Sequence, residues 1–588
     1  MQPQPTLSPS QQGRQDSPEA DSLRMGCGWG KQETNQAWVL IETTAGDSHP
    51  GSVHLNHLAQ FAAKGVIANG ASPAHYTCTD ICDGIAQGTA GQYYSLPSRE
   101  IMLMACEMHA KAGHFDGAVF LSGCDKSLPA HLMAMIRLNL PAVVVPGGVM
   151  EAGPEGMTLE GVGTLYAQKR RGELDEDTYK FLRTHACPSS GSCAFFGTAA
   201  TMQLLAEGIG FALPTTALIP AHLNALKDAA RQAGKRVTEL ITENLRPRDI
   251  FTQKALENAL MIHAATGGSS NALIHLAAMA KEAGLVFSYE TVNAINQRVP
   301  FILNLKPSGK LTVDKLWYAG GVYRVLKELK SLLHLEALTV TGLTLGENLE
   351  ILEKSGHFEK IEGFLANYNA KTTDIICPIN QPLKPRGATC ILTGNLAPDG
   401  AVIKTSAMMQ KDSAFTGEAR VFDGQNAARE AVLAGKISPG TVVVIRYEGP
   451  AATGMPEQFY ITEAIASNPL LSSTVALVTD GRFSGATRGS MIGHVSPEAA
   501  RGGPIAHVND GDLIHFNLDL QTLDIIGING QPCSPEIVSQ HLKQRQKEAD
   551  GTPMRFGKIA GLKTGLLGLY CQHALPVSEG AGLSTSFL

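Results

Sequence analysis

From about residue 35 to 340 the chain alternates short β-branched apolar runs with segments of helical apolar spacing. The run 117–122 (GAVFLS) precedes a helix-like segment at 128–138, and the run 142–145 (AVVV) follows and leads into a pair of glycines. This order is typical of βαβ units, whose strands lie parallel and whose helices cover the sheet. We therefore predict an α/β domain with a largely parallel sheet over residues 23–375.

A second domain is expected beyond this point. The stretch 367–386 loses the helical spacing and gains proline and polar residues, which indicates a domain boundary near 375. Strand-like segments separated by turns then follow, at 388–406, 440–450, 473–483 and 511–527. We predict a mainly β, barrel-like domain over residues 376–575.

Both chain ends are poor in apolar residues. Residues 1–22 and 576–588 are too polar to repay the entropy lost on ordering, so we predict a disordered arm and a disordered tail. No run approaches the ~18 apolar residues of a membrane span, and the first 22 residues lack the apolar core of a signal peptide. We expect a cytoplasmic protein without a membrane partner.

Charge and composition narrow the range of partners. The 48 Lys and Arg against 54 Asp and Glu give a net charge of -6, so nothing favours binding to nucleic acid. Charged residues make up only 17% of the chain, below the ~25% of typical soluble domains. We expect a homodimer or homotetramer that hides part of this surface.

Two segments place a thiol beside a carboxylate. Cys124-Asp125-Lys126 follows a predicted strand and precedes a predicted helix, and Cys82-Asp83 lies in a glycine-rich loop. Thiolate is a soft ligand and carboxylate a hard one, so such pairs can serve an iron–sulfur cluster and Mg²⁺ together. Taken singly, each is also explained by a buried thiol beside an ion pair or by an Asp-Gly turn.

A third thiol, Cys193, lies among small residues just before an apolar-periodic segment that opens at Gly197-Thr198. Its sulfur is expected near a helix N-terminus, where the dipole favours the thiolate. Cys187 could be the ligand equally well by spacing, and a core thiol is the alternative for both. The 11 cysteines show no disulfide framework.

The second domain contributes Glu457 and Ser484, each after a predicted strand. Ser484 lies between Phe483 and Gly485 in a tight loop that can expose a hydroxyl. The segment has no Gly-x-Ser-x-Gly elbow and no triad spacing, so a loop-capping serine is the alternative.

Together these segments resemble the dihydroxy-acid dehydratase/phosphogluconate dehydratase family of iron–sulfur and Mg²⁺-dependent hydro-lyases. The resemblance extends from about residue 35 to 560. The matching segments, in order, are CDGIAQGTAGQYYSLPSRE, GCDKSLPAHLMA, VPGGVMEAG, GSCAFFGTAATM, HAATGGSSN, AGGV, GNLAPDGAVIKT, GMPE and DGRFSGATRGSMIGHVSPEAARGGPI.

The resemblance assigns roles in both domains. It implies cluster ligation by Cys124 and Cys193. It implies a Mg²⁺ site made by Asp83, Asp125, Lys126 and Glu457. Lys126, carboxylated in the family, and Ser484, acting as the alkoxide base, are the implied catalytic residues. Ser269 and Asn271 belong to a loop, 263–271, that resembles a substrate-lining segment.

The chain departs from the family at the third cluster ligand. Many members carry it in a Pro-Cys-Asn segment, but the matching stretch GDSHPGSVHL has Gly51 at that position. Sugar-acid members carry a Cys directly before Asp-Gly, as Cys82 does here. This favours Cys82 as third ligand and leaves a 2Fe-2S or a 4Fe-4S cluster open.

We predict a hydro-lyase that dehydrates a 2,3-dihydroxy acid, an aldonic (sugar) acid in the first instance, to a 2-keto-3-deoxy acid. LNLPAVVVPGG and VSPEAARGGPI look equally like the branched-chain dihydroxy-acid dehydratase, which is the alternative. A non-catalytic iron–sulfur sensor would not need the carboxylates and Ser484. A nucleotide-dependent oxidoreductase would need a Gly-x-Gly-x-x-Gly that is missing after the first strand.

Overall fold

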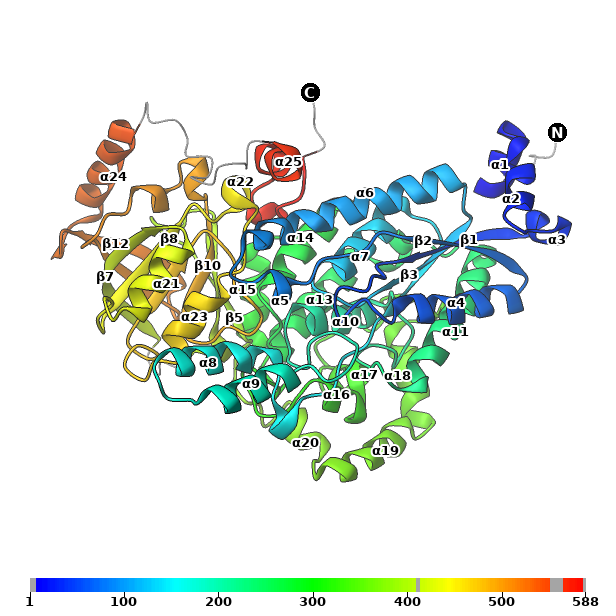
Figure 1. Ribbon diagram of the computed structural model, residues 1–588, viewed down its shortest axis with the longest axis horizontal. Coiled ribbons are helices and arrows are strands. Elements are labelled where there is room, and N and C mark those ends of the chain that lie inside the picture. The colour runs from blue at the N-terminus through cyan, green and yellow to red at the C-terminus, as the bar shows by residue number, and fades with distance from the viewer. Residues whose placement is uncertain (1–6, 409–412, 550–563, 585–588) are drawn as a thin grey trace.

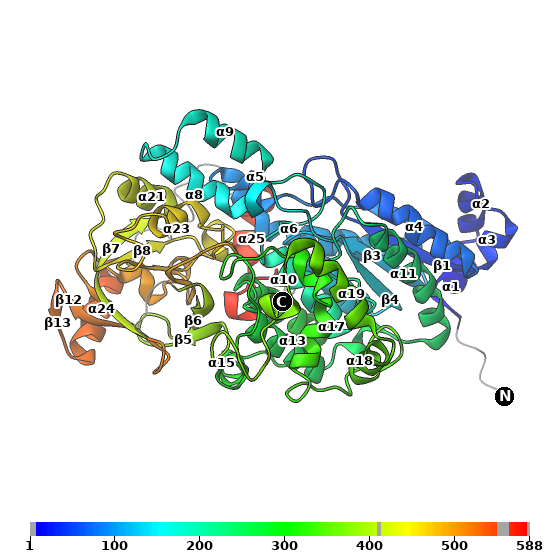
Figure 2. The same ribbon diagram turned by 90° about the horizontal axis from the view of Figure 1, so that it is seen from below.

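The computed structural model describes residues 7–408, 413–549 and 564–584. Two parts lie side by side, the N-terminal one drawn blue to green and the C-terminal one yellow to orange (Figure 1, and from below in Figure 2). Each is organised by its own sheet. The predicted fold class, a parallel α/β domain followed by a barrel-like β domain, is confirmed.

The N-terminal sheet has four parallel strands in the order β2-β1-β3-β4. They are β1 (Ala37–Thr43), β2 (Ala71–Thr77), β3 (Gly117–Ser122) and β4 (Ala142–Pro146). All residues of β3 and β4 are buried, as expected for parallel strands covered on both faces. The covering helices include α4 (Leu55–Ala68), α6 (Ser95–Gly113), α7 (Ser127–Leu138) and α11 (Asn224–Glu243).

The C-terminal sheet has nine strands in the order β13-β12-β11-β7-β8-β9-β10-β6-β5, mixes parallel and antiparallel pairs, and curls into a half-barrel. Its parallel centre consists of β7 (Ala414–Asp423), β8 (Thr441–Arg446), β9 (Ala476–Thr479) and β10 (Ser490–Ser496). The antiparallel flanks are β5 (Thr389–Leu392), β6 (Gly400–Lys404), β11 (Leu513–Asn517), β12 (Thr522–Ile528) and β13 (Gln531–Pro532). Most of its apolar core forms a cluster distinct from that of the first domain, but Ile391 of β5 and Val402 of β6 pack into the first domain's core.

The C-terminal end of the chain returns to the first domain. Helix α25 (Gly565–His573), drawn red, lies beside α6. The Tyr570 hydroxyl donates to Ala581 O (2.5 Å), and Arg99 Nη2 donates to Gly580 O (2.8 Å). The predicted disordered tail is therefore wrong for residues 576–584, because backbone hydrogen bonds and buried small side chains such as Val577 hold this segment in place. Residues 585–588 lie outside the described residues.

The predicted disordered arm is also wrong, from residue 7 onward. Two short helices, α1 (Pro9–Asp16) and α2 (Glu19–Gly26), pack at the outer edge of the N-terminal sheet. Arg24 in α2 lies 4.9 Å from the ring centroid of Trp29 and 5.0 Å from that of Trp38. Polar and cation–π contacts, together with the packing of Ala20 and Trp29 against the core of the first domain, account for the order.

Asp116 is the main anchor of this arm. Its carboxylate accepts hydrogen bonds from Ser10 N (2.9 Å), Ser10 Oγ (2.6 Å) and Trp38 N (2.8 Å). Asp116→Ala leaves these buried donors without a partner, so we expect a loss of about 1–3 kcal/mol in the free energy of unfolding. Trypsin should then cut at Arg14 or Arg24 much faster than in the wild type. Asp228→Ala, which breaks an exposed ion pair to Arg231, is the control, and equal cleavage of both variants would contradict the anchoring role.

None of the helices in the described part of the chain has the length and hydrophobicity needed to span a bilayer.

Candidate active site

A cavity at the junction of the two domains collects the predicted reactive residues. It leaves about 100 Å³ of free space, enough for several waters or a small acid. The predicted site residues that line it are Cys82, Asp83, Cys124, Asp125, Cys193, Glu457 and Ser484. Cys187 is not among its lining residues.

Strand ends deliver these side chains to the cavity. Cys124 and Asp125 follow the end of β3, and Asp83 opens the short helix α5 (Asp83–Ala86) after β2. Because the carboxyl ends of parallel strands meet at one edge of the sheet, these groups converge there. Glu457 and Ser484 come from loops of the second domain, where an isolated bridge pairs Glu457 with Arg482.

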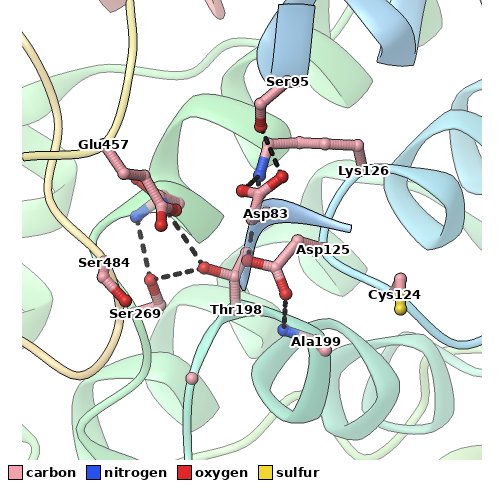
Figure 3. Close-up of polar contacts among 12 residues, drawn as sticks. Asp83, Ser95, Cys124, Asp125, Lys126, Thr198, Ala199, Ser269, Glu457 and Ser484 are labelled. Atoms are coloured by element: carbon pink, nitrogen blue, oxygen red, sulfur yellow. Dashed lines mark hydrogen bonds and ion pairs between the residues drawn. The ribbon is translucent and has the colours of Figure 1, made fainter. Parts of the chain in front are cut away.

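Three carboxylates form the most compact group in the cavity. One oxygen from each of Asp83, Asp125 and Glu457 lies within 4.8 Å of the others. Figure 3 shows Asp83 and Asp125 close together, with Glu457 facing them across the site. Hard oxygen ligands at this spacing suit a divalent cation such as Mg²⁺.

Two cations compensate these carboxylates. Lys126 Nζ donates to Asp83 Oδ2 (2.7 Å), and Arg482 Nη1 donates to Glu457 Oε1 (2.5 Å). Burial alone would raise the pKa of Asp83, but Lys126 and Arg482 outweigh it and hold this pKa at about 2. Burial raises the pKa of Glu457 to about 7 and also raises that of Asp125.

Arg482 was not predicted from the sequence. Its side chain is fully buried, donates from Nη2 to Ser95 Oγ (2.8 Å) and from Nε to Met455 O (2.7 Å), and lies 3.6 Å from Asp83. Ser95 in turn donates to Asp83 Oδ1 (2.5 Å). The available signal was its place two residues before Ser484 in the matching segment DGRFSG.

The three thiols lie around the same cavity without converging on one point. Among the described residues they do not form a group whose sulfurs all lie within 4.8 Å of one another, so they do not fit a single ion. Burial raises the pKa of Cys82 to about 11 and raises the pKa values of Cys124 and Cys193 well above their usual range.

Helix α10 (Thr198–Ile209) begins five residues after Cys193, as the sequence predicted. Burial raises the pKa of this thiol and so opposes the thiolate that the helix dipole was expected to favour.

The predicted substrate-lining residues lie behind the cavity wall. Asn271 Nδ2 donates to Glu457 Oε1 (2.7 Å) and to Thr198 Oγ1 (3.1 Å), and the Ser269 hydroxyl lies 2.9 Å from Thr198 Oγ1. Neither Asn271 nor Ser269 lines the cavity, and both are fully buried. In this structure they position Glu457 and Thr198.

Ser484 faces the cavity from the second domain, close to the carboxylates (Figure 3). Its hydroxyl accepts from Ala486 N at 3.3 Å, a long bond that leaves the oxygen accessible. Ser484 and Lys404 also line a smaller neighbouring cavity, and burial lowers the pKa of Lys404 to about 8. Buried ionisable groups whose pKa values move in opposite directions around one cavity are typical of an enzyme.

Comparison with known proteins identifies the enzyme family to which the chain belongs. The models of the dihydroxy-acid/6-phosphogluconate dehydratase N-terminal and C-terminal domains match residues 36–348 and 374–581. The chain therefore belongs to this family and is a dehydratase, a hydro-lyase.

Curated relatives named dihydroxy-acid dehydratase cover most of the chain. The relative from Caldicellulosiruptor bescii is 41% identical over 86% of this chain and 89% of its own. Those from Solidesulfovibrio magneticus and Methanosarcina barkeri are each 42% identical over 86% of this chain and 89% and 90% of their own. These names favour the branched-chain alternative over the sugar-acid substrate that was predicted first from the sequence.

Proposed function

We propose that the protein is a dihydroxy-acid dehydratase that converts a branched-chain 2,3-dihydroxy acid into the corresponding 2-keto acid. The observation that carries this choice is the apolar wall of the cavity. Seven of the side chains that line the cavity carry no hydrogen-bonding group: Ile81, Leu159, Val162, Phe195, Ala199, Phe459 and Ala486.

An apolar wall favours a branched aliphatic tail. Phe195, Phe459 and Ala486 pack together as one cluster, with Leu159 and Tyr460 at its margin. A hydroxyl group on the tail of a sugar acid that packed against these apolar side chains would lose its water without gaining a partner from them, at a cost of about 1–3 kcal/mol. A methyl-branched tail gains by burial against the same surface.

The residues present fit the two cofactors that the family implies. The three clustered carboxylates suit Mg²⁺, and the separated thiols, too far apart for one ion, suit a multi-iron cluster held by Cys124, Cys193 and one further ligand. When bound, these groups would supply positive charge and Lewis acidity to the substrate carboxylate and to the leaving C3 hydroxyl.

The protein's own residues handle the C2 proton. The proposed acceptor is the Ser484 oxygen, which lines the cavity, and the Lys404 ammonium, which lines the smaller cavity with it, would favour the deprotonated hydroxyl by charge. Loss of hydroxide from C3 leaves an enol, which tautomerises to the 2-keto acid. Arg482 keeps Asp83 ionised, and Lys126 adds to this effect while its amine is free, that is, not carboxylated.

A panel of substrates tests this assignment. With anaerobically prepared enzyme and Mg²⁺, 2,3-dihydroxyisovalerate should give keto acid with a kcat/KM at least 10-fold above that for xylonate, arabinonate, galactonate, gluconate or 6-phosphogluconate, since the apolar wall discriminates by ≥1.4 kcal/mol. No nucleotide should be required. Phe459→Ser is the matched variant, and it should reduce the ratio of kcat/KM for 2,3-dihydroxyisovalerate to kcat/KM for the sugar acids. A higher kcat/KM for any sugar acid would reverse the choice of substrate.

A further inference from the structure

His49 lies against one of the cluster thiols. It belongs to the loop after β1, is buried, and its Nδ1 is 3.8 Å from Cys124 Sγ. His49, Asp80 and Cys124 each offer a ligand atom within 4.8 Å of the other two. Among the described residues, only this group and the three carboxylates meet that distance limit.

The hydrogen bonds of His49 define its tautomer. Nε2 lies 2.6 Å from Asp80 Oδ1 and 3.1 Å from Ser52 Oγ, and the Ser52 hydroxyl donates to Gly46 O (2.9 Å). Nε2 therefore carries the proton, and the Nδ1 lone pair faces Cys124. A histidine that donates one ring N–H to a carboxylate and turns the other nitrogen to a metal is the usual arrangement at metal sites.

The distance between His49 and Cys124 fits ligation of one metal atom. With metal–sulfur and metal–nitrogen bonds of about 2.3 and 2.1 Å, two ligands of a tetrahedral metal lie roughly 3.6 Å apart. The observed 3.8 Å needs almost no movement.

Gly51 connects this pair to the departure from the family pattern. Gly51 stands where many members carry the third cluster cysteine. A Cβ atom at this position would collide with Cys124 Sγ and would lie 3.3 Å from His49 Nδ1. The imidazole of His49 thus lies close to the position that the thiol of a cysteine at residue 51 would take.

We infer that His49 Nδ1 is the third protein ligand of the cluster, in place of the predicted Cys82, and that Asp80 positions the imidazole. This inference rests on the cluster of the proposed function. Imidazole replaces thiolate in some two-iron clusters and raises their reduction potential, so the substitution is chemically sound.

Pulsed EPR of the anaerobically reduced holoenzyme tests the ligand directly. We expect a strong ¹⁴N coupling that is replaced by a ¹⁵N pattern when histidine alone is labelled. His49→Ala should lose most of the iron, whereas His49→Cys should retain it with no nitrogen coupling and a lower reduction potential. Asp80→Asn should release iron to a chelator about 10–100-fold faster. Circular dichroism should show that each variant is folded.

Controls separate this inference from the proposed function. Cys82→Ser and the exposed His57→Ala should both keep the iron and the nitrogen coupling. Two results would overturn the role of His49 and leave the cluster itself intact. One is a wild-type protein that holds iron but shows no nitrogen coupling. The other is loss of iron in Cys82→Ser together with full iron content in His49→Ala. Absence of iron and acid-labile sulfide from the wild type would instead overturn the cluster itself.

Discussion

Ser484→Ala should lower kcat by about 10²–10⁴-fold, the usual effect of losing a general base. Iron content, Mg²⁺ binding and folding should not change, because the hydroxyl makes only one long hydrogen bond, from Ala486 N. Steady-state kinetics with 2,3-dihydroxyisovalerate measures the loss in kcat, and metal analysis measures whether iron and Mg²⁺ are retained. If Ser484 only capped its loop, the variant would lose about 1 kcal/mol of stability and would retain turnover.

Two further measurements make the Ser484 prediction specific. In D₂O the wild type should place deuterium at C3 of the product during tautomerisation. Lys404→Met should lower kcat without removing metal, because Lys404 lines the smaller cavity with Ser484 and is not among the residues that line the main cavity. Near-normal turnover of Ser484→Ala would leave the proton acceptor to another residue.

Arg482→Met should destabilise the protein by about 3–5 kcal/mol, the usual loss when one partner of a buried ion pair is removed. The change leaves Glu457 and Asp83 with less compensating charge in a buried site. Added Mg²⁺ should restore part of the loss by binding the same carboxylates, so the rise in Tm on adding Mg²⁺ should be larger than in the wild type. Thermal unfolding with and without Mg²⁺ measures this.

A matched control for Arg482 exists in the same domain. Arg420 pairs with Asp510 at 2.6 Å, but both side chains are about half exposed. Arg420→Met should change stability by only about 0–1 kcal/mol and should not alter the response to Mg²⁺. Equal losses in the two variants would show that Arg482 does not act through the buried carboxylates.

The parts of the fold that were predictable have a local signal. The runs 117–122 and 142–145 form β3 and β4 because continuous β-branched segments suit strands buried on both faces. The arm at α1 and the segment after α25 were missed because their order depends on Asp116 and Arg99, which are distant in sequence. The composition of a segment indicates how much apolar surface its own residues can bury, but not which distant residues will bind it.

The same distinction holds for the site. Cys124, Asp125 and Glu457 were found through matching segments, and the structure brings them to one cavity. Arg482 and His49 were missed because their roles come from partners far along the chain, Asp83 and Asp80 among them. Asn271 was assigned to the substrate, although its contacts are with Glu457 and Thr198.

The division of the site between two domains sets the order in which it can be completed during synthesis. Cys124, Cys193 and His49 all belong to the first domain, so the proposed cluster would draw its protein ligands from that domain alone. The proposed Mg²⁺ site would also need Glu457, and α25, which packs on α6, follows later still in the chain. On these proposed assignments a nascent chain would be able to bind iron before it could bind Mg²⁺, and in that interval the second domain would not yet shield the cluster from oxygen.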